Sequence, residues 1–303
     1  MSISGSIVIL LLLILRQINL IPKRLIYALW FVALIRMAVP FAMSSSISVF
    51  NYFSGFIKRL IPVGNLFDTN FTVSNYFNAV LSYEPMEYKT QRLEWVFGVS
   101  SVIWGIGVCI FLIGIIIFYY SAIRQYKTAI HLRDNIYEDS NAVSPFLLGI
   151  KSPKIIFPIG LDIDSPRAAY MIAHEKTHMK RMDNLWRIIG LIAVCIHWFN
   201  PIAWIGFSFF LKDMELSCDE ATVKGYDFVK KKEYAEALLS IAENVPIAKV
   251  QNKDIAHASF GKSDVKSRIL HVMTYRRLSV LGVAVSIVFL LFISVILLTN
   301  PNG

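Results

Sequence analysis

The hydrophobic positions of the chain gather into four long apolar stretches separated by polar connections. Each stretch approaches or exceeds the ~20 apolar residues that a ~30 Å hydrocarbon layer requires. The stretches are Ile3–Leu20, Tyr27–Met43, Val96–Tyr120 and Leu278–Leu298. With 55% hydrophobic and 17% charged residues in 303, the chain carries more apolar surface than a soluble core of this size could bury. The pattern predicts a multi-pass membrane protein.

The first apolar stretch has a second interpretation, as a signal peptide. It has no basic residues ahead of it, and no small-residue cleavage site follows Leu20. A retained membrane anchor is therefore the preferred interpretation.

The basic residues predict an orientation in the membrane. Lys and Arg gather between the first two stretches, after the third and before the fourth, whereas the charges of residues 44–94 balance. The positive-inside rule then places both termini outside the cell. The expected domains are a two-helix transmembrane hairpin (1–43), an extracellular loop (44–95), a third transmembrane helix (96–120), a cytoplasmic domain (121–277) and a fourth transmembrane helix (278–298).

The net charge of +9 favours contact with anionic membrane lipids. Direct nucleic-acid binding is not expected, because no basic-aromatic motif or recognition helix stands out. The sequence does not fix the oligomeric state and is compatible with a homodimer.

The cytoplasmic block predicts several local elements. A polar helix-like segment is expected near residues 122–137, followed by strands within 144–161. Residues 151–161 could offer an exposed edge to a peptide, and the alternative is that residues 155–157 are buried as a core strand. Ser165 and Pro166 have the residue types of a helix N-cap and first helical position, so a helix is expected from Pro166 to about Asp183.

The apolar run of residues 185–211 is interrupted by Asn200-Pro201. Two short helical arms, re-entrant or lying on the membrane, suit it better than one crossing. A crossing would also separate His174 from Glu215. The helix that follows is expected to break near Gly225.

The segment "AHEKTHMKRMD" carries the candidate chemistry. His174 and His178 are four residues apart, so on a helix their rings share a face and can bind one ion. A hydrolytic zinc site takes three protein ligands and leaves one position for water. Glu175 follows the first histidine and could act as the general base on that water. The alternative is a solvent-facing helix with two histidines.

The segment "MELSCDEA" supplies further donors. Glu215 could be the third ligand, and Asp219, one turn later, could accept the second ring N–H of a ligand histidine. Glu220 and Cys218 are alternative ligands. An acidic helix face is the simpler interpretation of this segment alone.

Several segments together resemble the membrane zinc peptidases of the BlaR/MecR antirepressor type. They are "PKRLIYALWFVALIRMAVP", "SPFLLGIKSPKIIFP", "AHEKTHMKRMDNLWR", "HWFNPIAW" and "MELSCDEA", and the resemblance extends from Ile3 to about Leu298. It implies that His174, His178 and Glu215 bind one Zn²⁺ and that Glu175 is the catalytic acid–base. It also implies signalling across the membrane by proteolysis, of the protein itself or leading to loss of a cytoplasmic repressor.

The fold class expected is a mainly α membrane protein with four transmembrane helices. They would carry a cytosolic, membrane-apposed, gluzincin-like zinc peptidase domain containing a small strand region. After Leu298 no S-x-x-K serine site is found, so direct acylation by a β-lactam is not expected. The loop of residues 44–95 is the remaining candidate for signal input.

Sensor members of the resembled family cut themselves at a Ser-Phe bond, and Ser259-Phe260 stands in a similar place. The hypothesis is an internal cleavage site; the alternative is a loop contact with Phe260 packed on the domain. His257 and His271 are weaker candidates for stabilising an oxyanion.

Two other functions are alternatives to a zinc endopeptidase. An intramembrane site-two protease needs an L-D-G-type motif on a later span, but Leu161-Asp162 precedes the histidines and is followed by Ile163. A zinc-binding sensor or scaffold that signals by conformation would not depend on Glu175. His197 is expected to pack rather than bind metal, and Arg36 to reach an interface or pair within the bundle.

Overall fold

The computed structural model describes residues 2–18, 21–39, 84–244, 262–275 and 280–298. The helices are α1 (Ser2–Leu15), α2 (Lys23–Ala38), α5 (Glu84–Gln125), α6 (Pro166–Arg181), α7 (Asp183–Ile196), α8 (Pro201–Thr222), the 3₁₀ turn η1 (Val223–Gly225), α9 (Phe228–Asn244), α11 (Lys262–Thr274) and α12 (Val280–Leu298). The strands are β1 (Ile130–Arg133), β2 (Ile136–Asp139), β3 (Phe146–Leu148) and β4 (Lys154–Pro158). The expectation of a mainly helical protein with a small strand region is confirmed.

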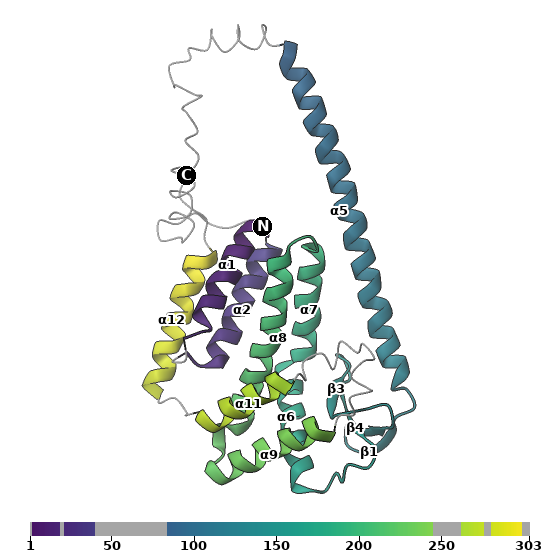
Figure 1. Ribbon diagram of the computed structural model, residues 1–303, viewed down its shortest axis with the longest axis vertical. Helices are drawn as coiled ribbons and strands as arrows, with labels where there is room; N and C mark the ends of the chain where they lie inside the picture. The colour runs from purple at the N-terminus through teal and green to yellow at the C-terminus, as the bar shows by residue number, and fades with distance from the viewer. Residues whose placement is uncertain (1, 19–20, 40–83, 245–261, 276–279, 299–303) are drawn as a thin grey trace.

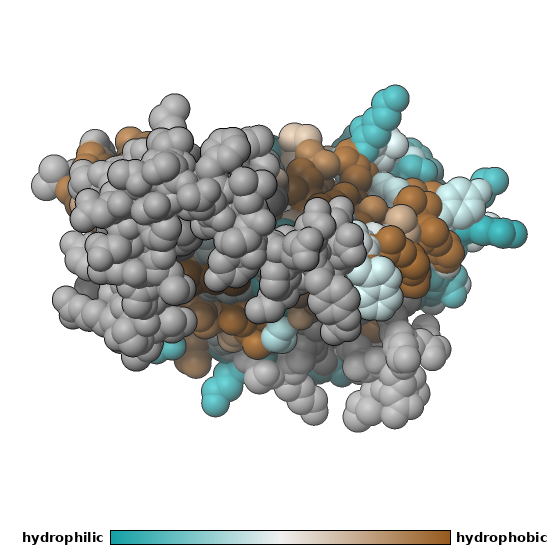
Figure 2. Space-filling view, turned by 90° about the horizontal axis from the view of Figure 1, so that it is seen from above, coloured by the Kyte–Doolittle hydropathy of each residue, from teal (hydrophilic) through white to brown (hydrophobic). Residues whose placement is uncertain are grey.

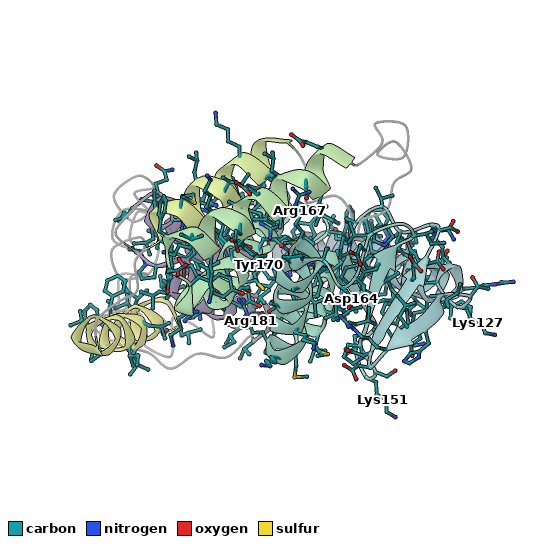
Figure 3. All side chains as sticks on the ribbon, turned by 90° about the horizontal axis from the view of Figure 1, so that it is seen from below. Lys127, Lys151, Asp164, Arg167, Tyr170 and Arg181 are labelled. Carbon is teal, nitrogen blue, oxygen red and sulfur yellow. The ribbon has the colours of Figure 1, made fainter. Side chains whose placement is uncertain are left out.

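The helices form two regions. Helices α1, α2, α7, α8 and α12 stand side by side, with α5 along one flank, while α6, α9, α11 and the strands lie at one end of this layer (Figure 1). Where the view from above colours the surface, it is largely hydrophobic, and hydrophilic side chains project at the rim (Figure 2). The opposite end carries charged side chains, of which Lys127 and Lys151 point outward (Figure 3).

The helical layer has its own hydrophobic core. Val8 and Leu12 of α1 pack with Leu29 of α2 and Met214 of α8, and all four are buried. α1 approaches α8 closely at Gly206, where an added Cβ would lie 2.9 Å from the Cγ2 atom of Ile9. The N-terminal helices are therefore packed directly on the helix that carries Glu215.

The described parts of the predicted membrane spans lie largely on helices, and these helices differ in length. In the part of the chain that the structure describes, the segment Trp95–Gln125 of α5 is the one helix long and apolar enough to cross a membrane. Ser2–Leu15 and Ile287–Leu298 are shorter apolar helices. Multi-pass topology and the orientation of the termini remain predictions.

A four-stranded sheet in the order β1-β2-β4-β3 follows α5. β1 pairs antiparallel with β2, β2 parallel with β4, and β3 antiparallel with β4. The expected polar helix over residues 122–137 is wrong beyond Gln125, because β1 and β2 form a hairpin there. Its turn contains Asp134 at φ 48, a left-handed conformation that Asp tolerates.

Of the two interpretations of residues 151–161, the buried core strand is confirmed and the exposed edge is wrong. β4, which comes directly before α6, is interior, and its Ile155 and Phe157 are buried with Ala168 and Ile172 of α6. The edge on the side of β4 is β3. A buried strand rather than a docking edge therefore supports α6.

The ends of α6, α7 and α8 follow their sequence signals. The Ser165 side chain accepts a hydrogen bond from the Ala168 amide, so the predicted start of α6 is confirmed. Met182, in the left-handed conformation, is the single residue between α6 and α7. Asn200 caps α8 by accepting from the Ile202 amide at 3.0 Å, so the predicted break is confirmed. The break near Gly225 is also confirmed.

Candidate metal centre

The two histidines of "AHEKTHMKRMD" meet on the buried face of α6. His174 and His178 are one turn apart, and their Nε2 atoms lie 3.0 Å from each other. Both side chains are buried. Two imidazole nitrogens this close, facing the same space, are arranged to bind one ion.

Glu215 of α8 completes a triangle with them. Its Oε2 atom lies 3.5 Å from Nε2 of His174, and its Oε1 atom lies 3.6 Å from Nε2 of His178. Ligands at about 2.0–2.1 Å around a tetrahedral zinc stand about 3.3 Å apart. The spacing of these three groups therefore fits a zinc ion without rearrangement of the helices.

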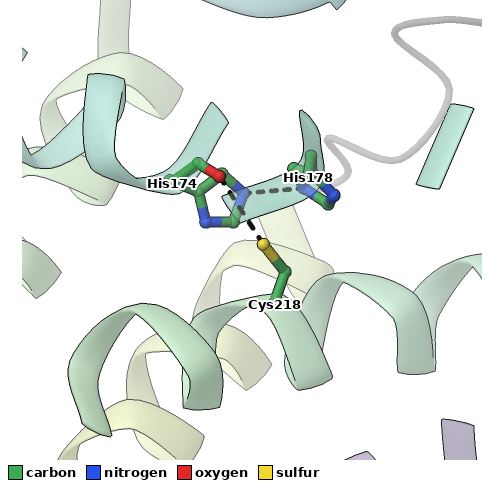
Figure 4. A group of neighbouring side chains, drawn as sticks. All are labelled: His174, His178 and Cys218. Carbon is green, nitrogen blue, oxygen red and sulfur yellow. Dashed lines mark hydrogen bonds between the residues drawn. The ribbon is translucent and has the colours of Figure 1, made fainter. Parts of the chain in front are cut away.

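Cys218 is a second donor on α8. The ligand atoms of His174, His178 and Cys218 lie within 4.8 Å of one another, and all three residues are buried. The Cys218 thiol donates to the backbone carbonyl of His174 at 3.7 Å (Figure 4). The two Glu215 oxygens face the two Nε2 atoms, so geometry favours Glu215 over Cys218 as the third ligand.

Both histidines have partners on their other ring nitrogen. Nδ1 of His178 lies 2.6 Å from Oδ2 of Asp183, and Nδ1 of His174 lies 2.9 Å from the Tyr234 hydroxyl. Oδ1 of Asp219 is 3.3 Å from Nδ1 of His174 and accepts the Tyr234 hydroxyl at 2.6 Å. Acceptors at Nδ1 hold the proton there and leave the Nε2 lone pair able to bind a metal, although Nη2 of Arg268 lies 3.2 Å from Nε2 of His174 in this structure.

Arg268 of α11 reaches into the same cluster. It donates two hydrogen bonds of 2.8 Å to Asp219, and its Nη1 atom lies 3.2 Å from Glu215. Burial would raise the pKa of Glu215, but His178 and Arg268 outweigh burial and hold that pKa well below its usual range. Arg268 likewise lowers the pKa of Asp219 against the effect of burial. Both carboxylates are therefore held ionised.

Glu175 borders a cavity of about 60 Å³ beside the triangle. Burial raises the pKa of Glu175, and the nearby His178 and His174 oppose that rise. A carboxyl with a raised pKa is better suited to accept and return a proton. The cavity is lined by Pro145, Phe146, Leu147, Met171, His174, Glu175, His178, Asn184, Arg187, Glu215, Leu238, Ile241, Val265 and Arg268.

The other candidates from the sequence lie elsewhere. Glu220 accepts from the backbone amides of Lys23 and Arg24 and from His271, so it and His271 face away from the cavity. His197 is buried and bonds to the Ala193 carbonyl. The Arg36 guanidinium donates to the Leu298 carbonyl, which is a pairing within the helical layer. Ser259, Phe260 and His257 lie outside the described residues.

Three residues of the site were not identified from the sequence. Asp183 could have been predicted as a partner of His178, because it is an acidic residue five positions later, at the expected end of the same helix. Tyr234 and Arg268 carried no such signal, because they belong to ordinary amphipathic segments 60 and 94 residues from His174. Only the fold brings them together.

Two histidines and a carboxylate, with a glutamate beside the first histidine, form the donor set of a metal-dependent hydrolase. Comparison with known proteins agrees: the chain belongs to the family described as BlaR1 peptidase M56, which it matches over residues 1–272. The resemblance to the BlaR/MecR type is thereby confirmed.

Two curated relatives give the extent of the similarity. The chain is 30% identical to "Regulatory protein BlaR1" of Bacillus licheniformis over 163 residues, which are 52% of this chain and 27% of that protein. It is 25% identical to "Methicillin resistance mecR1 protein" of Staphylococcus aureus over 141 residues, which are 45% of this chain and 23% of that protein. The matches thus cover about a quarter of each relative.

Proposed function

We propose that this protein is a membrane-embedded zinc endopeptidase that acts in transmembrane signalling. The observation that carries the proposal is the triangle of His174, His178 and Glu215 at the spacing of a tetrahedral zinc site, with Glu175 at the adjoining cavity. Family membership supports peptidase chemistry. The site residues keep the roles expected from the sequence.

The residues of the chain would divide the reaction between them. Zinc, held by His174, His178 and Glu215, would polarise the scissile carbonyl and make water a better nucleophile. Glu175 would take the proton from the attacking water and return it to the leaving amine. Tyr234 and Asp219 would hold His174 through its Nδ1 atom.

The edge strand offers a place for the substrate. Phe146 and Leu147 of β3 line the cavity, so a peptide added along β3 would run past Glu175. Asn184 already donates to the carbonyls of Leu147 and Gly149 at 2.9 and 3.0 Å. A peptide on this edge would hydrogen-bond to other backbone groups of β3, or it would displace the Asn184 side-chain amide from these two carbonyls.

The substrates we propose are the protein itself, at Ser259-Phe260, and a cytoplasmic regulator such as a transcriptional repressor. The description of the Bacillus licheniformis relative as a regulatory protein supports a signalling role. The peptidase domain would face the cytoplasm from a multi-pass cell-membrane protein with both termini outside, in contact with anionic lipids. Homodimerisation is compatible with this arrangement.

A non-proteolytic zinc sensor or scaffold is the alternative function. It would use the same ligand triangle but would not need Glu175. The two functions therefore differ in one substitution that leaves all proposed ligands in place.

The test is fragment mapping by intact mass of the full chain in membranes, with bound zinc quantified. Wild type is compared with Glu175→Gln and with Glu236→Gln, a half-exposed glutamate on α9. We expect zinc in all three and fragments ending near Ser259 in wild type and Glu236→Gln only. Signalling that survives Glu175→Gln with zinc still bound would establish the sensor instead. Absence of zinc from all three would remove both functions.

A further inference from the structure

Tyr27 of α2 is joined to the proposed metal ligand His178 by two successive hydrogen bonds. The Tyr27 hydroxyl donates to Oδ1 of Asp183 at 2.9 Å. The other oxygen of that carboxylate, Oδ2, lies 2.6 Å from Nδ1 of His178. Tyr27 and Asp183 are both buried, so water does not compete for either bond.

The Tyr27 ring is held on several sides. It lies edge-on to Phe31 at 5.2 Å and stacks with Phe210 at 5.7 Å between ring centroids. The Arg181 guanidinium lies over it at 4.6 Å. A ring fixed in this way moves with α2, and its hydroxyl moves with it.

Asp183 depends on Tyr27 for its orientation. Besides the Tyr27 hydroxyl, Oδ1 of Asp183 has one charged neighbour among the described residues. This neighbour is the Nε atom of Arg181, at the longer distance of 3.4 Å. Loss of the Tyr27 hydroxyl would leave the Asp183 carboxylate free to rotate. Its Oδ2 atom, which fixes the His178 ring, would then also move. Partners of this kind orient metal-binding histidines and raise their basicity.

α2 also contacts the second ligand-bearing helix. The backbone amides of Lys23 and Arg24 donate to the Glu220 carboxylate of α8 at 2.9 and 3.2 Å. Trp30 donates to Asp213 of α8 at 2.9 Å. α2 is thus tied to the junction after His178 and to the helix that carries Glu215.

We infer that Tyr27 is a positioning residue for the metal centre, acting on His178 through Asp183, so that metal affinity depends on where α2 lies in the helical layer. The inference rests on the metal site of the proposed function but not on proteolysis. A displacement of α2 would lengthen the Tyr27–Asp183 bond and loosen the His178 ring. The helical layer would in this way control the centre without contacting the metal.

The test measures zinc binding by the full chain in lipid nanodiscs, by competition with a fluorescent chelator, in a Glu175→Gln background that cannot cleave. Tyr27→Phe removes only the hydroxyl. We expect roughly tenfold weaker zinc binding, at the lower end of what loss of such partners costs. We also expect a changed visible spectrum of the Co²⁺-substituted protein, which reports ligand geometry.

Trp30→Phe is the matched control. It removes a buried hydrogen bond from the same helix to Asp213, which contacts neither histidine. The bonds from Lys23 and Arg24 to Glu220 still hold α2 on α8, so the unfolding midpoint should fall while zinc affinity and the Co²⁺ spectrum stay unchanged. A double-mutant cycle with Asp183→Asn adds a second criterion. Without the Asp183 carboxylate, Tyr27→Phe should have no further effect on affinity.

Three results would overturn the inference. They are wild-type zinc affinity and spectrum in Tyr27→Phe, an equal loss of affinity in Trp30→Phe, and an undiminished effect of Tyr27→Phe in the Asp183→Asn background. Zinc binding without any cleavage by the wild type would remove the proposed function and leave this inference standing. Absence of zinc binding in every variant would remove both.

Discussion

Arg268 and Asp219 face each other through two hydrogen bonds, from Nε to Oδ2 and from Nη2 to Oδ1, each 2.8 Å long. Both side chains are buried, and the pair joins α11 to α8 beside the His174 ring, where Asp219 is 3.3 Å from Nδ1 and Arg268 is 3.2 Å from Nε2. A bidentate arginine–carboxylate pair is among the stronger charge-assisted contacts in proteins. It holds α11, which follows the segment containing Ser259, against the proposed metal centre.

Removal of Arg268 should destabilise the fold strongly. Arg268→Ala would leave Asp219 and Glu215 buried without their counter-charge, at a cost of about 3–5 kcal/mol. The midpoint of thermal unfolding in detergent is the measurement. Arg133→Ala is the control, because it breaks an exposed pair with Asp164 and should cost less than about 1 kcal/mol. Equal effects of the two variants would contradict a buried structural ion pair.

The third metal ligand can be identified by comparing two donors on α8. Glu215→Ala should abolish stoichiometric zinc binding, because only His174 and His178 would remain. Cys218→Ser should keep it, because the Cys218 thiol is engaged with a backbone carbonyl. Zinc content of the purified chain measures both. The reverse pattern would make Cys218 the ligand and favour a structural site.

The N-cap of α6 should contribute measurably to stability. Ser165→Ala removes the side-chain acceptor for the Ala168 amide and should lower the free energy of unfolding by about 1 kcal/mol. Ser165→Asp keeps an acceptor and adds a charge that is favourable at a helix N-terminus, so it should retain most of the stability. If Ser165→Asp lost as much as Ser165→Ala, the cap would not be the cause.

The close approach of α1 to α8 should make Gly206 sensitive to size. Gly206→Val would press on the Ile9 side chain, and overpacking of this kind costs about 1–3 kcal/mol. Gly114→Val on α5 is the matched control, because a Cβ there meets nothing within 4 Å. Thermal unfolding in one detergent should separate the two variants. Tolerance of valine at both positions would argue against tight packing of α1 on α8.

Sequence patterns predicted the parts of the fold that depend on local chemistry. Ser165-Pro166 marked the start of α6, and Asn200-Pro201 marked the break between α7 and α8. These signals act within one helical turn, so no tertiary information was needed. The spacing of His174 and His178 also follows from the period of a single helix.

Contacts between distant segments could not be predicted from such local sequence patterns. The β1–β2 hairpin was missed because its Asp134 turn interrupts a stretch whose polar residues suit a helix equally well. Arg268 and Tyr234 reach the centre only through the packing of α9 and α11 around α6. The edge position of β3 depends on the order of the strands, which residue pattern alone does not determine.

The attachment of α2 to Asp183, Asp213 and Glu220 has a consequence for dissecting the protein. Asp183 is the first residue of α7, and Asp213 and Glu220 lie on α8; all three are buried and accept hydrogen bonds from α2. A fragment starting after α2 would remove these donors from all three carboxylates, and a hydrogen bond to a charged group is worth about 1.5–3 kcal/mol. We therefore expect the proposed catalytic portion to need α2 in order to fold.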